Sequence, residues 1–171
     1  MPELYLLRHA HAGDPDGWHG PDAERPLSAR GRDQAERAGA WLAAIGFKPD
    51  AIVSSPKVRA RETAELATDS LPGAPGVQLD DRLSGGFDAG DLEPLLEELA
   101  EALGDLGRPA RIMLVGHDPD FSELLCELVG TASLTMRKGA LARVDLPDGR
   151  ESIARGSAEL RWLVPPDAMP G

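Results

Sequence analysis

The sequence predicts an α/β protein built as a three-layer αβα sandwich, with a mostly parallel central sheet and helices on both faces. Short apolar runs alternate along the 171-residue chain with longer segments whose apolar residues recur at helical spacing. Strands that alternate with helices of this length form βαβ units, which pair their strands in parallel. Hydrophobic residues make up 42% of the chain, which excludes a disordered protein. The length predicts a single domain over residues 1–171.

The predicted strands are short and almost entirely apolar. Leu4-Tyr5-Leu6-Leu7 has no polar residue in alternate positions, as expected of a strand that is buried on both faces. Residues 12–25 and 80–90 are polar and are predicted to form loops. The strands are expected at residues 4–7, 51–53, 77–79, 112–115, 140–146 and 160–164.

The predicted helices have recognisable beginnings and ends. Ser28 is expected to cap the first helix, and Gly46 to end it. Ser55-Pro56 is expected to open the second, with the serine as cap and the proline in the first turn. Two further helices carry apolar stripes over residues 92–103 and 121–129.

Charge and composition exclude several classes of function. The chain has 18 Lys and Arg against 29 Asp and Glu, a formal charge of −11, which argues against nucleic-acid and anionic-membrane partners. No apolar run approaches the roughly 18 residues of a membrane-spanning helix. The first residues show no signal peptide, and the single cysteine, Cys126, rules out an intrachain disulfide. We therefore expect a cytoplasmic protein.

Two arginines and two histidines follow three of the predicted strands. Arg8 and His9 follow the first strand, Arg59 lies one turn into the helix after residues 51–53, and His117 follows residues 112–115. Ligands of parallel sheets bind beyond the carboxyl ends of the strands, where helix N-termini also favour anions. Arginine binds phosphate oxygens at two points, and histidine can act as a nucleophile. The pattern predicts a phosphate pocket that contains a histidine nucleophile.

Four motifs, in order over residues 4–129, carry a family resemblance. They are Leu7-Arg8-His9-Ala10, Arg25-Pro26-Leu27-Ser28 with Gly31, Ser55-Pro56-Lys57-Val58-Arg59-Ala60 with Thr63, and Val115-Gly116-His117-Asp118-Pro119. This series resembles the histidine phosphatase superfamily, also called phosphoglycerate mutase-like. Ala10 stands where the family usually has glycine. In having alanine at this position, the chain resembles the SixA-type branch of phosphohistidine phosphatases.

The resemblance implies a mechanism. His9 would attack phosphorus and become phosphorylated, while Arg8, Arg59 and His117 would hold the three non-bridging oxygens. Water would then hydrolyse the phosphohistidine. The resemblance implies no cofactor, and no metal-ligand spacing is visible in the sequence. A compact domain without a coiled-coil seam is expected to be a monomer.

The general acid is the least defined part of this mechanism. The segment 80–93 is rich in carboxylates, among which Asp88 is the preferred candidate. An imidazole, with a pKa of roughly 6.5, leaves phosphorus with little help, whereas an alkoxide needs an acid. A pocket without a strong acid therefore favours phosphohistidine on a protein as the substrate. A general phosphomonoesterase acting on small phosphate esters, and a catalytically silent phosphate- or phosphoprotein-binding module, stay open as alternatives. A mutase is disfavoured, because the chain shows no long insertion that would cover a bisphosphate.

Three further residues have competing interpretations. His11 is expected at the pocket rim, either as a solvated loop side chain or as a substrate contact. Arg25 is expected to tie to an acidic neighbour rather than to a ligand. Ser55 is interpreted as a helix cap and not as a nucleophile, because its motif contains no adjacent base.

Overall fold

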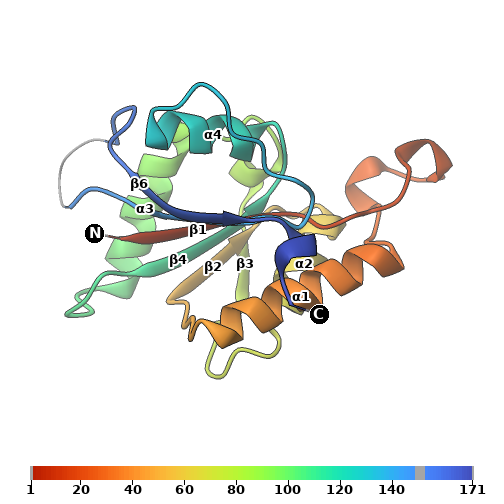
Figure 1. Ribbon diagram of the computed structural model, residues 1–171, viewed down its shortest axis with the longest axis horizontal. Helices are drawn as coiled ribbons and strands as arrows, with labels where there is room; N and C mark the ends of the chain where they lie inside the picture. Colours follow the sequence, from red (N-terminus) through yellow and green to blue (C-terminus); the bar gives the residue numbers. More distant parts are fainter. Residues whose placement is uncertain (1, 149–152, 171) are drawn as a thin grey trace.

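The protein is built on a six-stranded mixed sheet, seen edge-on in the computed structural model (Figure 1), which describes residues 2–148 and 153–170. The strand order is β3-β2-β4-β1-β5-β6. The first four of these strands pair in parallel, whereas β5 is antiparallel to both β1 and β6. The strands are β1 Glu3–Arg8, β2 Ala51–Ser54, β3 Val77–Leu79, β4 Arg111–Gly116, β5 Leu141–Asp145 and β6 Glu159–Val164.

Four α-helices cover the two faces of this sheet. Side chains of β1 alternate, so that Tyr5 and Leu7 pack with α1 and α2 while Leu4 and Leu6 pack with α3 and α4. Figure 1 shows the two helix pairs on opposite sides of the sheet. The predicted αβα sandwich is confirmed. The helices are α1 Ala29–Ala44, α2 Val58–Thr68, α3 Ala89–Leu103 and α4 Asp120–Val129.

The predicted helix ends are confirmed in two cases and wrong in a third. Ser28 caps α1 by accepting a hydrogen bond from the Gly31 amide, and Gly46, in the left-handed conformation, follows the last residues of α1. The second helix, however, begins at Val58, after a cap position at Lys57 that makes no side-chain cap bond. Ser55 is therefore too far upstream to cap it.

Both polar segments predicted as loops contain short 3-10 helices. Residues 12–25 include η1 Pro15–Gly17 and η2 Asp22–Glu24, and residues 80–90 include η3 Asp81–Ser84. A fourth, η4 Pro166–Ala168, follows β6. Within the described parts of the chain, no helix has both the length and the apolar character needed to cross a membrane.

Gly31 allows α1 to approach the segment that follows β1. A Cβ atom at this position would lie 1.9 Å from the His11 carbonyl oxygen. The Ser28 amide donates to that same carbonyl, so the two segments are fixed against each other. The close packing of α1 against the segment after β1 thus requires a glycine at position 31, in the Arg-Pro-Leu-Ser motif.

Replacing Gly31 by alanine is expected to lower the free energy of unfolding by about 1–3 kcal/mol, because the new methyl group must displace backbone. Gly17→Ala is the matched control, because a Cβ at Gly17 would meet nothing within 4 Å. Its effect should stay within about 0.5 kcal/mol. Urea unfolding of both variants measures the difference, and equal stabilities would contradict the close approach.

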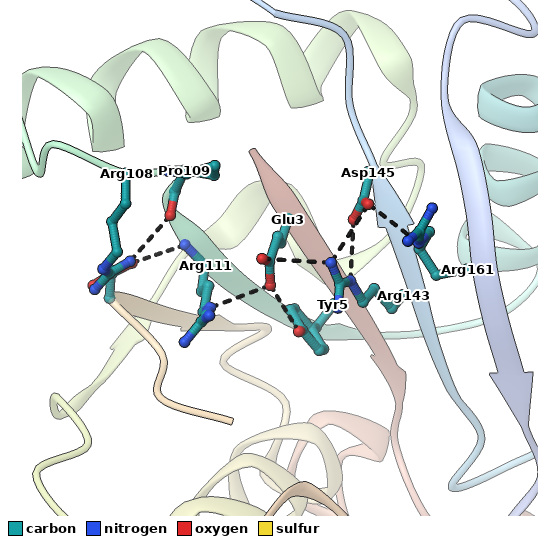
Figure 2. Close-up of polar contacts among 9 residues, drawn as sticks. Glu3, Tyr5, Arg108, Pro109, Arg111, Arg143, Asp145 and Arg161 are labelled. Carbon is teal, nitrogen blue, oxygen red and sulfur yellow. Dashed lines mark hydrogen bonds and ion pairs between the residues drawn. The ribbon is translucent and has the colours of Figure 1, made fainter. Parts of the chain in front are cut away.

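Ion pairs tie together the strands at the end of the sheet that lies away from the predicted pocket (Figure 2). Glu3, the first residue of β1, contacts Arg111 at 3.2 Å and Arg143 at 3.4 Å. Asp145, opposite Glu3 on β5, contacts Arg143 at 3.0 Å and Arg161 at 3.3 Å. The arginines at this end are therefore paired with carboxylates and are not available to bind an anion.

Candidate active site

The four residues predicted to form a phosphate pocket come together at the carboxyl ends of the parallel strands. Because β1 and β4 are neighbours, His9 and His117 follow adjacent strands, and their ring centroids lie 5.1 Å apart. Arg59 reaches the same place from the first turn of α2. These side chains and Arg8 line one cavity of about 320 Å³. Its other lining residues are Arg25, Lys57, Ser84, Gly85, Asp118, Pro119, Asp120 and Lys138.

The His9 ring is held at one nitrogen, and no described residue bonds the other. Nδ1 lies 2.8 Å from the Ala10 carbonyl oxygen, which can only accept, so Nδ1 carries the proton. Burial lowers the pKa of His9 to about 3, and the charges of Arg59 and Arg8 act in the same direction. At neutral pH the ring is therefore uncharged, with the lone pair on Nε2. This is the form that can attack phosphorus.

The His117 ring contacts a side chain that the sequence suggested would cap a helix. Nε2 of His117 lies 2.7 Å from Oγ of Ser55, whose hydroxyl also accepts a hydrogen bond from the Lys57 amide. The pKa of His117 is lowered to about 3, mainly by burial, with smaller contributions from His9 and Arg59. Ser55 therefore orients a site histidine instead of capping α2. A bound phosphoryl dianion would oppose these effects and favour the charged imidazolium.

Arg8 is anchored at one nitrogen only. Its Nη1 donates to the Met136 carbonyl oxygen at 2.7 Å and lies 3.6 Å from the Asp118 carboxylate. Among the described residues, none accepts a hydrogen bond from Nη2. The guanidinium is thus positioned by protein contacts while donors remain for an anion.

Asp22, from the polar segment before α1, holds Arg59. The Arg59 guanidinium donates to the Asp22 carbonyl oxygen at 2.9 Å and to its carboxylate at 3.0 Å. Arg25 donates to the other carboxylate oxygen at 3.2 Å and to the Ala12 carbonyl at 2.8 Å. Although burial acts to raise it, the pKa of Asp22 is lowered by Arg25 and Arg59. The segment 12–25 is thus attached to the cavity through a carboxylate that sequence reasoning did not identify.

Arg25 and Lys138 also line the cavity, and so add to its positive charge. Arg25 makes the tie to an acidic neighbour that was expected, yet its side chain faces the same cavity as Arg59. Lys138 was not identified from the sequence. The cavity has five cationic side chains, from Arg8, Arg25, Lys57, Arg59 and Lys138, against the two carboxylates of Asp118 and Asp120. A net charge of −11 is thus compatible with a locally basic pocket.

Asp88, the preferred candidate for a general acid, is not among the residues that line this cavity. Its carboxylate caps α3 instead, accepting hydrogen bonds from the amides of Gly90 at 2.8 Å and Asp91 at 3.2 Å. The Asp91 side chain completes a capping box by accepting from the Asp88 amide. Helix capping accounts for this carboxylate, which the structure does not bring to the other four residues.

Asp88→Ala is expected to lower the free energy of unfolding by about 1 kcal/mol through loss of the cap, with kcat retained. Asp88→Asn, which keeps a capping oxygen, should retain both properties. Denaturant unfolding and phosphatase assays of the two variants provide the measurement. A tenfold fall in kcat at unchanged stability would show that Asp88 reaches the substrate.

His11 lies beside the cavity rather than in it. Its Nδ1 is 2.7 Å from Oγ of Ser28, and its amide donates to the Gln34 side chain at 2.9 Å. The ring lines an adjoining cavity of about 540 Å³, which shares Arg8 and Lys138 with the first. The structure thus does not bring His11 into contact with the space between His9 and His117.

The two buried histidines predict a pH dependence of stability. Unfolded histidines bind a proton below a pH of roughly 6.5, whereas His9 and His117 in the fold do so only near a pH of about 3. Because the unfolded chain then binds more protons, the free energy of unfolding falls as the pH decreases through this interval. His9→Gln should make the decrease shallower, and His19→Gln, at an exposed position, should not. Urea unfolding between pH 4 and 7 measures the slopes, and equal slopes for wild type and His9→Gln would contradict the assignment.

An αβα fold with arginines and histidines around one cavity at the strand ends is the arrangement expected of an α/β phosphatase. The family model of the histidine phosphatase superfamily (branch 1) matches residues 4–111, and the chain belongs to that superfamily. A protein of Picosynechococcus sp. whose function is uncharacterised is 34% identical over 121 residues, 71% of this chain and 69% of the relative. The protein is thus a phosphatase of the histidine phosphatase superfamily.

Solved structures share the fold over nearly the whole chain. The protein histidine phosphatase SixA, in complex with tungstate, superimposes with a TM-score of 0.79 at 23% identity, covering 96% of this chain and 97% of SixA. The alpha-ribazole phosphatase from Shigella flexneri gives a TM-score of 0.67 at 21% identity, covering 94% and 95% of the two chains. At these identities the likeness establishes the fold alone.

Proposed function

We propose that the protein is a SixA-type phosphatase that hydrolyses phosphohistidine on a protein through a phosphorylated His9. The observation that carries this proposal is the state of the carboxylates in the cavity. Asp118 accepts hydrogen bonds from Oγ of Ser122 at 2.6 Å and from its amide, and lies near Arg8. Asp120 accepts one from the Phe87 amide at 3.2 Å. Protein donors thus occupy both oxygens of Asp118 and one oxygen of Asp120, and we assign neither carboxylate as the general acid.

A pocket of this kind suits a leaving group that needs no acid. In a phosphohistidine substrate the bond that breaks is P–N, and the departing imidazole has a pKa of roughly 6.5. An alkoxide leaving from a sugar phosphate is far more basic and requires a proton in the transition state. The SixA likeness supports the same substrate class.

The reaction proceeds in two displacements. In a substrate phosphohistidine whose other ring nitrogen carries a proton, Nε2 of His9 forms a bond to phosphorus as the P–N bond breaks, and the substrate histidine departs as a neutral imidazole. Arg8, Arg59 and His117 offset charge on the three non-bridging oxygens, which is the main contribution a protein makes to phosphoryl transfer. Water then attacks phosphorus, releasing inorganic phosphate and the neutral His9 ring.

A general phosphomonoesterase acting on small phosphate esters is the second candidate. Apart from Gly85 and Pro119, the residues that line the cavity are polar or charged, so the lining offers little apolar surface to select one leaving group, which favours broad acceptance. The likeness to an alpha-ribazole phosphatase supports this alternative. A silent phosphate-binding module is disfavoured by the free Nε2 of His9.

A substrate panel tests the proposal. A protein phosphorylated on histidine, a phosphoserine peptide, glucose 6-phosphate and p-nitrophenyl phosphate are compared by kcat/KM. We expect the phosphohistidine protein and the activated p-nitrophenyl ester to be hydrolysed, and the two alkyl phosphates to react at least roughly a hundredfold more slowly. Rapid turnover of glucose 6-phosphate with no action on phosphohistidine would overturn the proposal in favour of the second candidate. Monomeric state and cytoplasmic location stay predictions, measurable by light scattering and cell fractionation.

A further inference from the structure

A second basic cavity adjoins the active-site cavity. It has a volume of about 540 Å³, and Arg8 and Lys138 line both cavities. One wall comes from α1 and another from the segment before β5. The remaining lining residues are His11, Arg30, Asp33, Gln34, Arg37, Arg137, Pro166 and Asp167.

The position of Lys138 between the cavities follows from the pairing of β5 with β1. The Gly139 amide donates to the carbonyl oxygens of Arg8 and His9, both at 3.1 Å, and the Arg8 amide donates to the Ala140 carbonyl. These bonds hold the segment before β5 against the end of β1. Lys138 is therefore fixed beside the phosphate-binding groups by backbone contacts.

Two cations of this cavity, Arg30 and Lys138, have no ion-pair partner in the described part of the chain. Arg37 pairs with Asp33 at 2.9 Å, and Arg137 lies 4.0 Å from Asp167. Within residues 2–148 and 153–170, neither Arg30 nor Lys138 makes an ion pair or a side-chain hydrogen bond. Burial lowers the pKa of Lys138, and the charges of Arg8, Arg25, Arg59 and Arg30 lower it further. An anion in this cavity would relieve that repulsion.

Arg30 differs in this respect from the arginines at the far end of the sheet, which are paired with carboxylates. Arg30 and Lys138 thus add positive charge beside the phosphate pocket of a chain whose net charge is −11. Electrostatic attraction in such a concave site raises the local concentration of anionic ligands and orients them.

We propose that the second cavity is a subsite for a second anionic group of the substrate, bound by Arg30 and Lys138 while the phosphoryl group occupies the active site. This inference rests on the proposed function for its substrate: a phosphohistidine protein with an acidic side chain near the phosphorylated residue. The same chemistry is offered by a small molecule that carries a second phosphate. Specificity toward acidic sequences is thus determined on the α1 side of the cavity.

The test compares paired phosphohistidine peptides in which the flanking residues are either glutamate or glutamine. For wild type we expect a higher kcat/KM for the glutamate peptide, and a preference that declines as salt is raised toward 1 M. Arg30→Glu reverses one charge of the subsite and should reduce the ratio of the two kcat/KM values roughly five- to tenfold. Arg61→Glu makes the same change in net charge at a half-buried position of α2, outside both cavities, and should leave the ratio unchanged.

A second part of the experiment distinguishes a protein substrate from a small-molecule ligand. It also tests the subsite independently of the proposed function. Inhibition of p-nitrophenyl phosphate turnover is measured with fructose 6-phosphate and with fructose 1,6-bisphosphate. One outcome is that the bisphosphate inhibits more strongly than the monophosphate, that Arg30→Glu abolishes this difference, and that wild type shows no preference for the glutamate peptide. This result assigns the subsite to a small bisphosphate and overturns the acidic-protein substrate. If no phosphohistidine peptide is hydrolysed, the proposed function fails, and the bisphosphate comparison alone decides the subsite. Equal ratios in wild type and Arg30→Glu, together with equal inhibition by the two sugars, overturn the subsite while leaving the proposed function standing.

Discussion

His9→Ala is expected to lower kcat by roughly 10⁴-fold or more, for every substrate that the protein hydrolyses. The alanine variant lacks the Nε2 lone pair that the hydrogen bond from Nδ1 to the Ala10 carbonyl leaves exposed to the cavity. None of the other groups around the cavity replaces it, because His117 directs its Nε2 toward Ser55 at 2.7 Å. Turnover of p-nitrophenyl phosphate, whose leaving group needs no acid, isolates the nucleophilic step.

The intermediate offers a second readout of the same change. The enzyme is briefly reacted with a ³²P-labelled phosphohistidine protein, denatured and separated from it. The enzyme should then carry labelled phosphate that is labile in acid and stable in base. The label should disappear in His9→Ala. His19→Ala is the control, because His19 is an exposed histidine of the segment before α1. Equal rates in wild type and His9→Ala, or a label that persists in the variant, would remove His9 as the nucleophile.

Arg59→Ala is expected to lower kcat by roughly 10²–10³-fold, the effect of losing about 2.7–4 kcal/mol of transition-state stabilisation. The Arg59 guanidinium is buried at the cavity, where an interaction with developing phosphoryl charge is screened little by water. Its contacts with Asp22 hold it in place before the substrate arrives. The loss should therefore appear in kcat more than in KM.

Two comparisons separate this effect from a structural one. Arg61→Ala removes a neighbouring half-buried arginine whose contact with Glu65 is 3.8 Å, and it should change kcat less than about twofold. Asp22→Asn keeps a side-chain acceptor but removes the charge, and should lower kcat less than Arg59→Ala does. Thermal unfolding shows whether each variant stays folded. An Arg59→Ala enzyme that is folded and retains full kcat would exclude a role for this residue in the transition state.

The charge distribution explains how an acidic protein can hold a phosphoryl group. Arginines at the far end of the sheet are paired with Glu3 and Asp145, whereas five cations face the candidate site against two carboxylates. The formal charge of the cavity lining is therefore opposite in sign to the net charge of the whole chain. A polyanion meets mostly the acidic surface, but a single phosphoryl group can enter a small basic cavity.

The sequence by itself determined the αβα layers and the four central side chains of the site. Buried parallel strands appear as uninterrupted apolar runs, and their carboxyl ends meet at one edge of the sheet. Arg8, His9 and His117 directly follow such strands, and Arg59 lies one turn into the next helix. Their convergence therefore depends only on local order along the chain and on parallel pairing.

The tertiary structure alone decided which other side chains face the cavities. Lys138 precedes a strand, and it reaches the site only because β5 runs antiparallel to β1, which brings the start of β5 to the end of β1. Asp22 reaches Arg59 across 37 residues of sequence. Ser55, expected to cap a helix, contacts His117 instead. Asp88, expected as a general acid, caps the first turn of α3 instead. Such contacts depend on how segments that are distant in sequence pack together. The periodicity and spacing of residues along the chain do not predict this packing.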